Sequence, residues 1–118
     1  MKTVLLVDDS KFMRLWLTRI LATADFSVIG EAGNGEEAIE KFKELRPDLV
    51  IMDLIMPHTD GFTVLKHILN LEPGAKVVIC SSMGQQSMIK ESLKIGAKGF
   101  IVKPHFKDVP SLLKKLFI

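Results

Sequence analysis

The segment LVIMD at residues 49–53 places four apolar side chains directly before an aspartate. The same arrangement, an apolar run that ends in polar residues, occurs in VLLVDD at 4–9, VVICSS at 77–82 and FIVK at 100–103. Short apolar runs without alternation are typical of strands buried on both faces of a parallel sheet. The segment 26–32 is less apolar, and it predicts a fifth strand at a sheet edge.

Apolar residues recur at helical spacing between these runs and predict five helices that alternate with the five strands. Ser10 and Asn34 stand at the expected N-caps of the first two helices, and Pro110 suits the first turn of the last. The residues expected to face the core are Met13, Leu17, Ile20, Leu21, Ala24, Ala38, Ile39, Phe42, Leu45, Phe62, Leu65, Ile68, Leu69, Met88, Ile89, Leu93, Leu112, Leu113, Leu116 and Phe117. Crossovers between parallel strands are right-handed, so the fold class is α/β, with a single doubly wound five-stranded parallel sheet and five helices.

The composition is that of one globular domain, which we expect to span residues 1–118. Of these 118 residues, 47% are hydrophobic and 25% are charged, as in ordinary globular proteins. No apolar run approaches the roughly 18 residues of a membrane span, and the start MKTVLLVDDS lacks the long apolar region of a signal peptide. We therefore expect a cytoplasmic protein without membrane insertion. The single Cys80 is expected to be a small buried residue.

Positive charge is concentrated toward the end of the chain. Residues 1–84 hold 9 Lys/Arg and 12 Asp/Glu, whereas residues 85–118 hold 7 Lys and 2 acids. Such a basic segment can bind nucleic acid, bind an acidic protein or form a solvated lysine surface. The charge pattern alone leaves all three open.

Polar residues follow four of the predicted strands. Asp8 and Asp9 follow the first, Asp53 the third, Ser81 the fourth and Lys103 the fifth. The carboxyl ends of parallel strands meet at one edge, where ligands bind at the point of strand-order reversal. With the flavodoxin-like order 2-1-3-4-5, the first and third strands are neighbours there, so the three acids should converge.

The chemistry of this set points to phosphoryl transfer. Ligands that offer only oxygen suit a hard cation such as Mg²⁺, with Mn²⁺ as an alternative. An aspartate can attack phosphorus as a nucleophile, and Lys103 and Ser81 could stabilise charge on the phosphoryl oxygens. Each residue alone has an ordinary interpretation as a helix cap, a turn residue or a solvated lysine. The specificity lies in the whole set, in which each member ends its own strand.

The segments VLLVDDS, DLVIMDLIMPHTDG, VVICSSMG and GAKGFIVKP resemble the signatures of receiver domains of bacterial response regulators along the whole chain. The segments VDDSKFMR and CSSMGQQ are similar to those of the single-domain chemotaxis members of that family. The resemblance implies the strand order 2-1-3-4-5 and a single receiver domain at residues 1–118.

The resemblance also implies roles for the acids. Asp53 matches the phosphoacceptor, and Asp9 and Asp53 match the direct Mg²⁺ ligands together with the backbone carbonyl of Ile55. Asp8 matches the acid that holds the ion through water. Lys103 matches the lysine that contacts the phosphoryl group, and a cis Lys103–Pro104 bond is expected after it.

Two further positions match the conformational switch of the family. Ser81 matches the switch hydroxyl and Phe100 the switch aromatic, which here lacks the hydroxyl of a tyrosine. Ile55 and Met83 occupy the two variable positions beside the phosphoryl site. Because both are apolar and cannot orient an attacking water, we expect slow autodephosphorylation.

The resemblance implies a phosphoacceptor that catalyses its own phosphorylation and is not a conventional enzyme. A CheA-like histidine kinase would be the phosphodonor, and a flagellar motor switch protein or another protein would be the target. A phosphatase partner, a monomeric state and no direct contact with nucleic acid are also expected.

A single-domain phosphorelay intermediary is the main alternative. A Mg²⁺-dependent phosphatase with an aspartate nucleophile is a weaker one, because its acids would follow a DxD pattern and no substrate pocket is evident. A DNA-binding regulator is disfavoured because no helix-turn-helix is visible, and a phosphorylation-independent binding module because the acceptor set is complete.

Overall fold

Five parallel strands form the central sheet in the order β2-β1-β3-β6-β7. Their bounds are Lys2–Val7 for β1, Phe26–Ala32 for β2, Leu49–Met52 for β3, Val77–Ser81 for β6 and Gly99–Val102 for β7. The structure, a computed structural model, describes all residues from 1 to 118. Among the five sheet strands the order reads 2-1-3-4-5, which confirms the predicted fold class and places the second strand at an edge.

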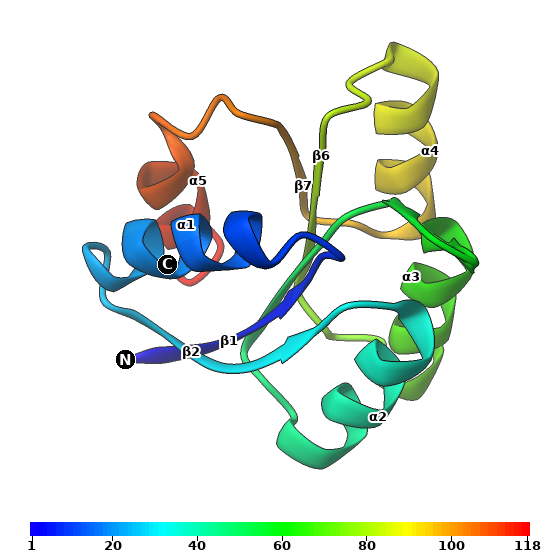
Figure 1. Ribbon diagram of the computed structural model, residues 1–118, viewed down its shortest axis with the longest axis horizontal. Helices are drawn as coiled ribbons and strands as arrows, with labels where there is room; N and C mark the ends of the chain where they lie inside the picture. Colours follow the sequence, from blue (N-terminus) through cyan, green and yellow to red (C-terminus); the bar gives the residue numbers. More distant parts are fainter.

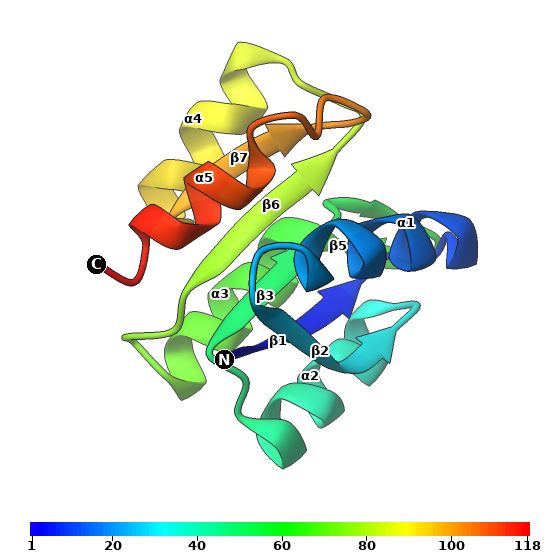
Figure 2. The same cartoon turned by 90° about the vertical axis from the view of Figure 1, so that its left-hand side faces the viewer.

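Helices cover both faces of the sheet (Figures 1 and 2). The helices are α1 (Lys11–Ala22), α2 (Gly35–Leu45), α3 (Gly61–Leu71), α4 (Gln86–Ile95) and α5 (Val109–Lys115). The residues of α1 and α5 pack with one face of the strands, and those of α2, α3 and α4 pack with the other. Successive residues of β1 alternate between these two cores: Val4 and Leu6 lie in one, Leu5 and Val7 in the other. The strands are apolar throughout because both of their faces are buried.

The predicted helix starts are present with their capping hydrogen bonds. Ser10 Oγ accepts from the N–H of Met13 at 3.2 Å, and Asn34 Oδ1 accepts from the N–H of Glu37 at 2.9 Å. These bonds satisfy amide groups that have no partner inside the first helical turn. The first cap fixes the direction in which α1 leaves the acidic segment after β1.

One predicted core position of helix α4 faces solvent. Leu93 was expected to face the core, but 47% of it is exposed. Met88 packs against the core as predicted, Ile95 does so as well, and Ser92 between them is fully buried. The buried Ser92 hydroxyl donates to the carbonyl of Met88 at 2.8 Å, so its burial leaves no unsatisfied polar group. The prediction for Leu93 was wrong because a satisfied serine can replace an apolar residue in the buried stripe.

A short antiparallel hairpin, which the sequence did not predict, joins β3 to α3. It consists of β4 (Ile55–Met56) and β5 (Thr59–Asp60). His58 at its tip adopts a left-handed backbone with φ of 55°. After the hairpin the chain passes so close to Leu54 that a Cβ on Gly61 would lie 2.4 Å from the Leu54 Cα. Only glycine fits at that point. Because Gly61 has no side chain, the chain can pass directly beside the end of β3 as it leaves the hairpin.

Cys80 lies inside the core with 1% of its surface exposed, as predicted. Burial, the largest influence, raises the pKa of its thiol to about 12. None of the helices combines the length and the apolar character that a membrane crossing needs.

Candidate functional site

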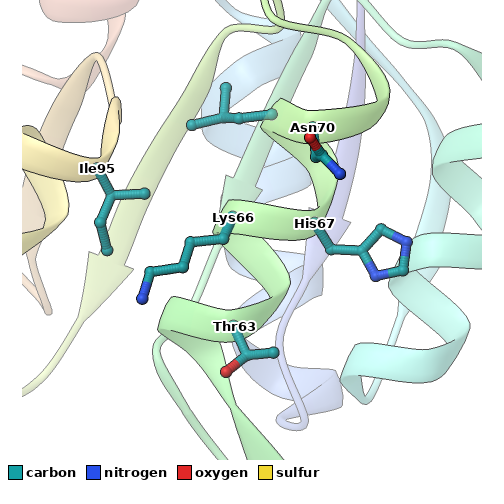
Figure 3. A pocket seen from close by; sticks show the side chains of 6 residues that line it. Thr63, Lys66, His67, Asn70 and Ile95 are labelled. Atoms are coloured by element: carbon teal, nitrogen blue, oxygen red, sulfur yellow. The ribbon is translucent and has the colours of Figure 1, made fainter.

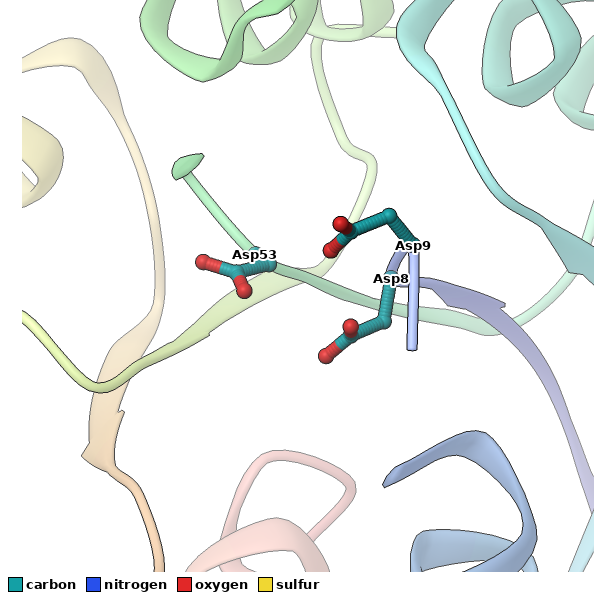
Figure 4. Close-up of side chains that lie close together, drawn as sticks. All are labelled: Asp8, Asp9 and Asp53. Carbon is teal, nitrogen blue, oxygen red and sulfur yellow. The ribbon is translucent and has the colours of Figure 1, made fainter. Parts of the chain in front are cut away.

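Three carboxylates meet at the carboxyl edge of the sheet. Asp8 and Asp9 follow β1, and Asp53 follows the neighbouring strand β3. One oxygen from each lies within 4.8 Å of the others. Figure 4 shows the three side chains leaving the strand ends toward the same side. Parallel neighbouring strands that end in register produce this convergence, because β1 and β3 pair through Val7 and Met52, immediately before the acids.

Every polar atom of Asp8 has a partner. Its N–H donates to the carbonyl of Ala32 at 2.9 Å, and its carbonyl accepts from Arg14 Nη1. Of the carboxylate oxygens, Oδ1 accepts from the N–H of Ser10 at 2.9 Å and Oδ2 from Lys103 Nζ at 2.6 Å. Asp8 is therefore a fixed, 3% exposed group rather than a mobile ligand. The contact with Arg14 was not predicted, because nothing in the sequence marks which arginine of a helix reaches a loop carbonyl.

Lys103 lies between two of the acids. Its Nζ also donates to Asp53 Oδ2 at 2.8 Å, and the side chains of Lys103 and Asp53 are only 10% and 7% exposed. Burial, the largest influence, opposes the charge of Lys103, but the hydrogen bonds and negative charges of Asp53 and Asp8 outweigh it and hold the lysine pKa above its ordinary value. Lys103 is thus a cation at neutral pH. Its single charge leaves two of the three negative charges of the cluster uncompensated.

The remaining carboxylate, that of Asp9, is exposed and makes no hydrogen bond or ion pair with the rest of the chain. Asp9 also lines an open polar hollow with Asn34, Glu36 and His58. An exposed acid next to two buried ones gives an ion a route from solvent to the cluster. Because the donors are all oxygen and the net charge is negative, the set fits a hard divalent cation such as Mg²⁺.

Of the two predicted switch residues, Ser81 ends β6 and Phe100 lies within β7. Ser81 is fully buried, and its Oγ accepts from the N–H of Met83 at 3.3 Å. Its carbonyl accepts from the N–H of Lys103 at 2.9 Å, which places both residues on the edge that carries the acids. Phe100 is half-buried and packs against the core on the α4 side.

Ile55 and Met83, which match the two variable positions, are apolar and open to solvent. The N–H of Ile55 donates to Asp53 Oδ1 at 3.0 Å, while 53% of Ile55 and 42% of Met83 are exposed. The expected cis Lys103–Pro104 bond is present.

Another hollow lies between α3 and α4 and shares no residue with the acids. Its labelled lining residues are Thr63, Lys66, His67, Asn70 and Ile95 (Figure 3). His67 is exposed there. None of the predicted site residues lines this hollow, so the acidic edge of the sheet is the candidate functional site.

Comparison with known proteins agrees with this geometry. The family model described as "Response regulator receiver domain" matches residues 4–116, and the chain belongs to this family. It is similar to two curated proteins named chemotaxis protein CheY. The one from Thermotoga maritima is 53% identical over 103 residues, which cover 87% of this chain and 86% of the relative. The one from Bacillus subtilis is 50% identical over 105 residues, or 89% and 88% of the two chains.

Solved structures show the same fold. A chain of the CheX–CheY–BeF₃–Mg²⁺ complex from Borrelia burgdorferi matches with a TM-score of 0.94 and 38% identity, over 99% of this chain and 90% of that one. The response regulator TrrA from Thermotoga maritima, in complex with Mg²⁺ and BeF, matches with a TM-score of 0.87 and 32% identity, over 98% and 99% of the two chains. Receiver domains are the phosphoacceptors of two-component response regulators, and the CheY relatives support a role in chemotaxis.

Proposed function

We propose that the chain accepts a phosphoryl group on Asp53 from a histidine kinase in a Mg²⁺-dependent reaction. The observation that carries this proposal is the grouping of Asp53 with Asp8, Asp9 and Lys103 at the end of neighbouring strands. Asp9, Asp53 and the backbone carbonyl of Ile55 would hold the ion directly, and Asp8 would hold it through water. Neighbours of the same family solved with Mg²⁺ and beryllium fluoride support the choice of ion.

Each protein group has a defined task in this proposal. A carboxylate oxygen of Asp53 forms the bond to phosphorus as the bond to the donor imidazole breaks. The bound Mg²⁺ would neutralise charge on the phosphoryl oxygens. Lys103, already paired with Asp53, supplies a second positive charge without having to be recruited. The Ser81 hydroxyl acts as an acceptor toward Met83, so its own proton is free to be donated to a phosphoryl oxygen.

The output surface would be the face of α4, β7 and α5. A phosphoryl group that draws Ser81 toward it opens space into which half-buried Phe100 can turn, and this shifts a two-state equilibrium of that face. The face carries the exposed lysines Lys90, Lys94, Lys98 and Lys107. An acidic segment of a flagellar motor switch protein is the proposed partner.

Reversing the charge of Lys90 and Lys98 together tests this surface. The double variant should bind an acidic motor-switch peptide more weakly, most clearly at low salt, because exposed charge pairs are screened as salt rises. Unchanged affinity at low salt would exclude the surface. The matched control reverses Lys41 and Lys43 on α2, which belong to another face.

The phosphorylated form is proposed to be long-lived. Ile55 and Met83 leave no polar side chain at the two positions beside Asp53 that could orient a water molecule for attack. A separate phosphatase partner for this chain is part of the proposal, because a slow intrinsic reaction leaves removal of the phosphoryl group to another protein. Loss of the phosphoryl group within seconds in the purified chain would contradict this part of the proposal.

Intact-protein mass spectrometry tests the central claim. Incubation with acetyl phosphate and Mg²⁺ should add one phosphoryl group to the wild-type chain and none to Asp53→Asn or to wild type without the ion. Labelling of Asp53→Asn to the same extent would refute the assignment. Transfer of the group onward to a second histidine-containing domain would favour the phosphorelay alternative, and turnover of a phosphate ester would favour a phosphatase.

A further inference from the structure

One side chain outside the acid cluster connects it to the edge of the sheet. Arg14 on α1 donates from Nη1 to the carbonyl of Asp8 and from Nε to Glu31 Oε1, the latter at 2.8 Å. Glu31 lies on the edge strand β2, one residue before Ala32, whose carbonyl accepts from the Asp8 N–H. We infer that Arg14, tethered by Glu31, is a positioning residue that sets the orientation of the Asp9 carboxylate toward a divalent cation; this rests on the proposed function of the site.

The inference follows from the planarity of the peptide group. The carbonyl of Asp8 and the N–H of Asp9 belong to one rigid plane, so a donor that holds that carbonyl also fixes the plane from which Asp9 departs. The side chain of Asp8 is already fixed by Ser10 and Lys103. Asp9 has no side-chain partner of its own. The direction of the Asp9 carboxylate therefore depends on the orientation of its backbone. Arg14 is the side chain that holds this backbone, through its hydrogen bond to the Asp8 carbonyl.

The geometry requires an arginine. Only 18% of the Arg14 side chain is exposed, and its two bonds leave from different nitrogens of one planar fork. A lysine carries a single nitrogen and cannot keep the same pair of directions. Glu31 is 51% exposed, so its ion pair with Arg14 adds little stability and serves mainly to hold the guanidinium in place.

Electrostatics and positioning predict opposite signs for the loss of Arg14. Removing a positive charge near three carboxylates should tighten the binding of a cation by Coulomb attraction alone. Loss of a positioning contact should weaken it, and partners that orient metal ligands typically contribute about 10-fold or more to affinity. The sign of the change therefore separates the two effects.

The test is a Mg²⁺ titration of isotope-labelled, metal-free protein, followed by NMR. Arg14→Gln is expected to raise the dissociation constant about 10-fold and to move the Asp9 amide resonance before any ion is added. Arg14→Lys, which keeps the charge, should also bind more weakly. Arg19→Gln is the matched control, since Arg19 is an exposed arginine of the same helix without an ion pair. The affinity of this variant for Mg²⁺ should stay the same or increase slightly.

Glu31→Gln keeps the test decisive if Arg14→Gln folds poorly. It should weaken Mg²⁺ binding in the wild-type background and have no effect in the Arg14→Lys background, because the tether acts only through an arginine that reaches both Glu31 and the Asp8 carbonyl. A purely electrostatic effect of Glu31 would persist in both backgrounds and would overturn the inference.

Two failures can be distinguished. If folded Arg14→Gln binds Mg²⁺ as tightly as wild type, while wild type binds the ion and becomes phosphorylated, only the positioning role of Arg14 is wrong. If wild type itself neither binds Mg²⁺ nor accepts a phosphoryl group, the proposed function fails first.

Discussion

Replacing Lys103 by methionine is the most informative perturbation of the site in the absence of metal. Lys103 Nζ is the only cation paired with Asp8, at 2.6 Å, and with Asp53, at 2.8 Å, and the three side chains are between 4% and 10% exposed. Removing one partner of a buried ion pair costs about 3–5 kcal/mol, because the remaining charge stays buried without compensation. The cluster opens to water beside Asp9, which favours the lower end, about 3 kcal/mol.

This cost should depend on the ion and on pH. For a chain of this length 1 kcal/mol corresponds to about 4 °C, so the melting temperature of metal-free Lys103→Met should fall by about 12 °C. Because the pKa of Lys103 is raised, its contribution is complete below the ordinary lysine pKa and disappears as pH rises through the raised value. Mg²⁺ should restore more stability to the variant than to wild type, since it enters a site with one more uncompensated negative charge.

Calorimetry and urea unfolding, with and without Mg²⁺, measure both effects. Lys107→Met is the matched control, because Lys107 is an exposed lysine four residues further on, and its unfolding free energy should change by no more than about 0.5 kcal/mol. A loss below about 1 kcal/mol in Lys103→Met, or equal rescue of both proteins by Mg²⁺, would refute the reasoning that Lys103 compensates the buried carboxylates.

Three further outcomes are expected. Excess Mg²⁺ should raise the melting temperature of the wild-type chain but not of Asp9→Ala, which lacks the exposed carboxylate; equal protection in calorimetry would place the ion elsewhere. Cys80, with its buried thiol of pKa about 12, should resist thiol reagents at neutral pH until the chain unfolds, and stoichiometric labelling of the native protein would contradict this. Gly61→Ala would place a Cβ 2.4 Å from the backbone of Leu54 and should lower the unfolding free energy by about 3 kcal/mol. Gly74→Ala is its control, since a Cβ there comes no closer than 3.7 Å to its nearest neighbour, and equal urea midpoints would show that the loop at Gly61 relaxes freely.

The helices and strands could be read from the sequence because period and capping are local properties. The apolar runs predicted each strand of the main sheet, and Ser10 and Asn34 predicted two helix starts that the structure shows. Predictions from local patterns were incomplete or wrong where tertiary packing decides the structure. The hairpin at 55–60 has strands of two residues, which are too short to show a period, and Leu93 turned outward because buried Ser92 satisfies its own hydroxyl.

The sequence by itself determined which side chains end each strand, because an apolar run followed by an acid or a lysine is visible within a few residues. It also carried the family signatures from which the strand order was inferred. Only the tertiary structure decided which of these groups touch. Lys103 is 95 residues from Asp8 and 50 from Asp53, and Arg14 is 17 from Glu31. Contacts over such separations depend on strand pairing and helix rotation, which are set by burial of the whole core rather than by any local pattern.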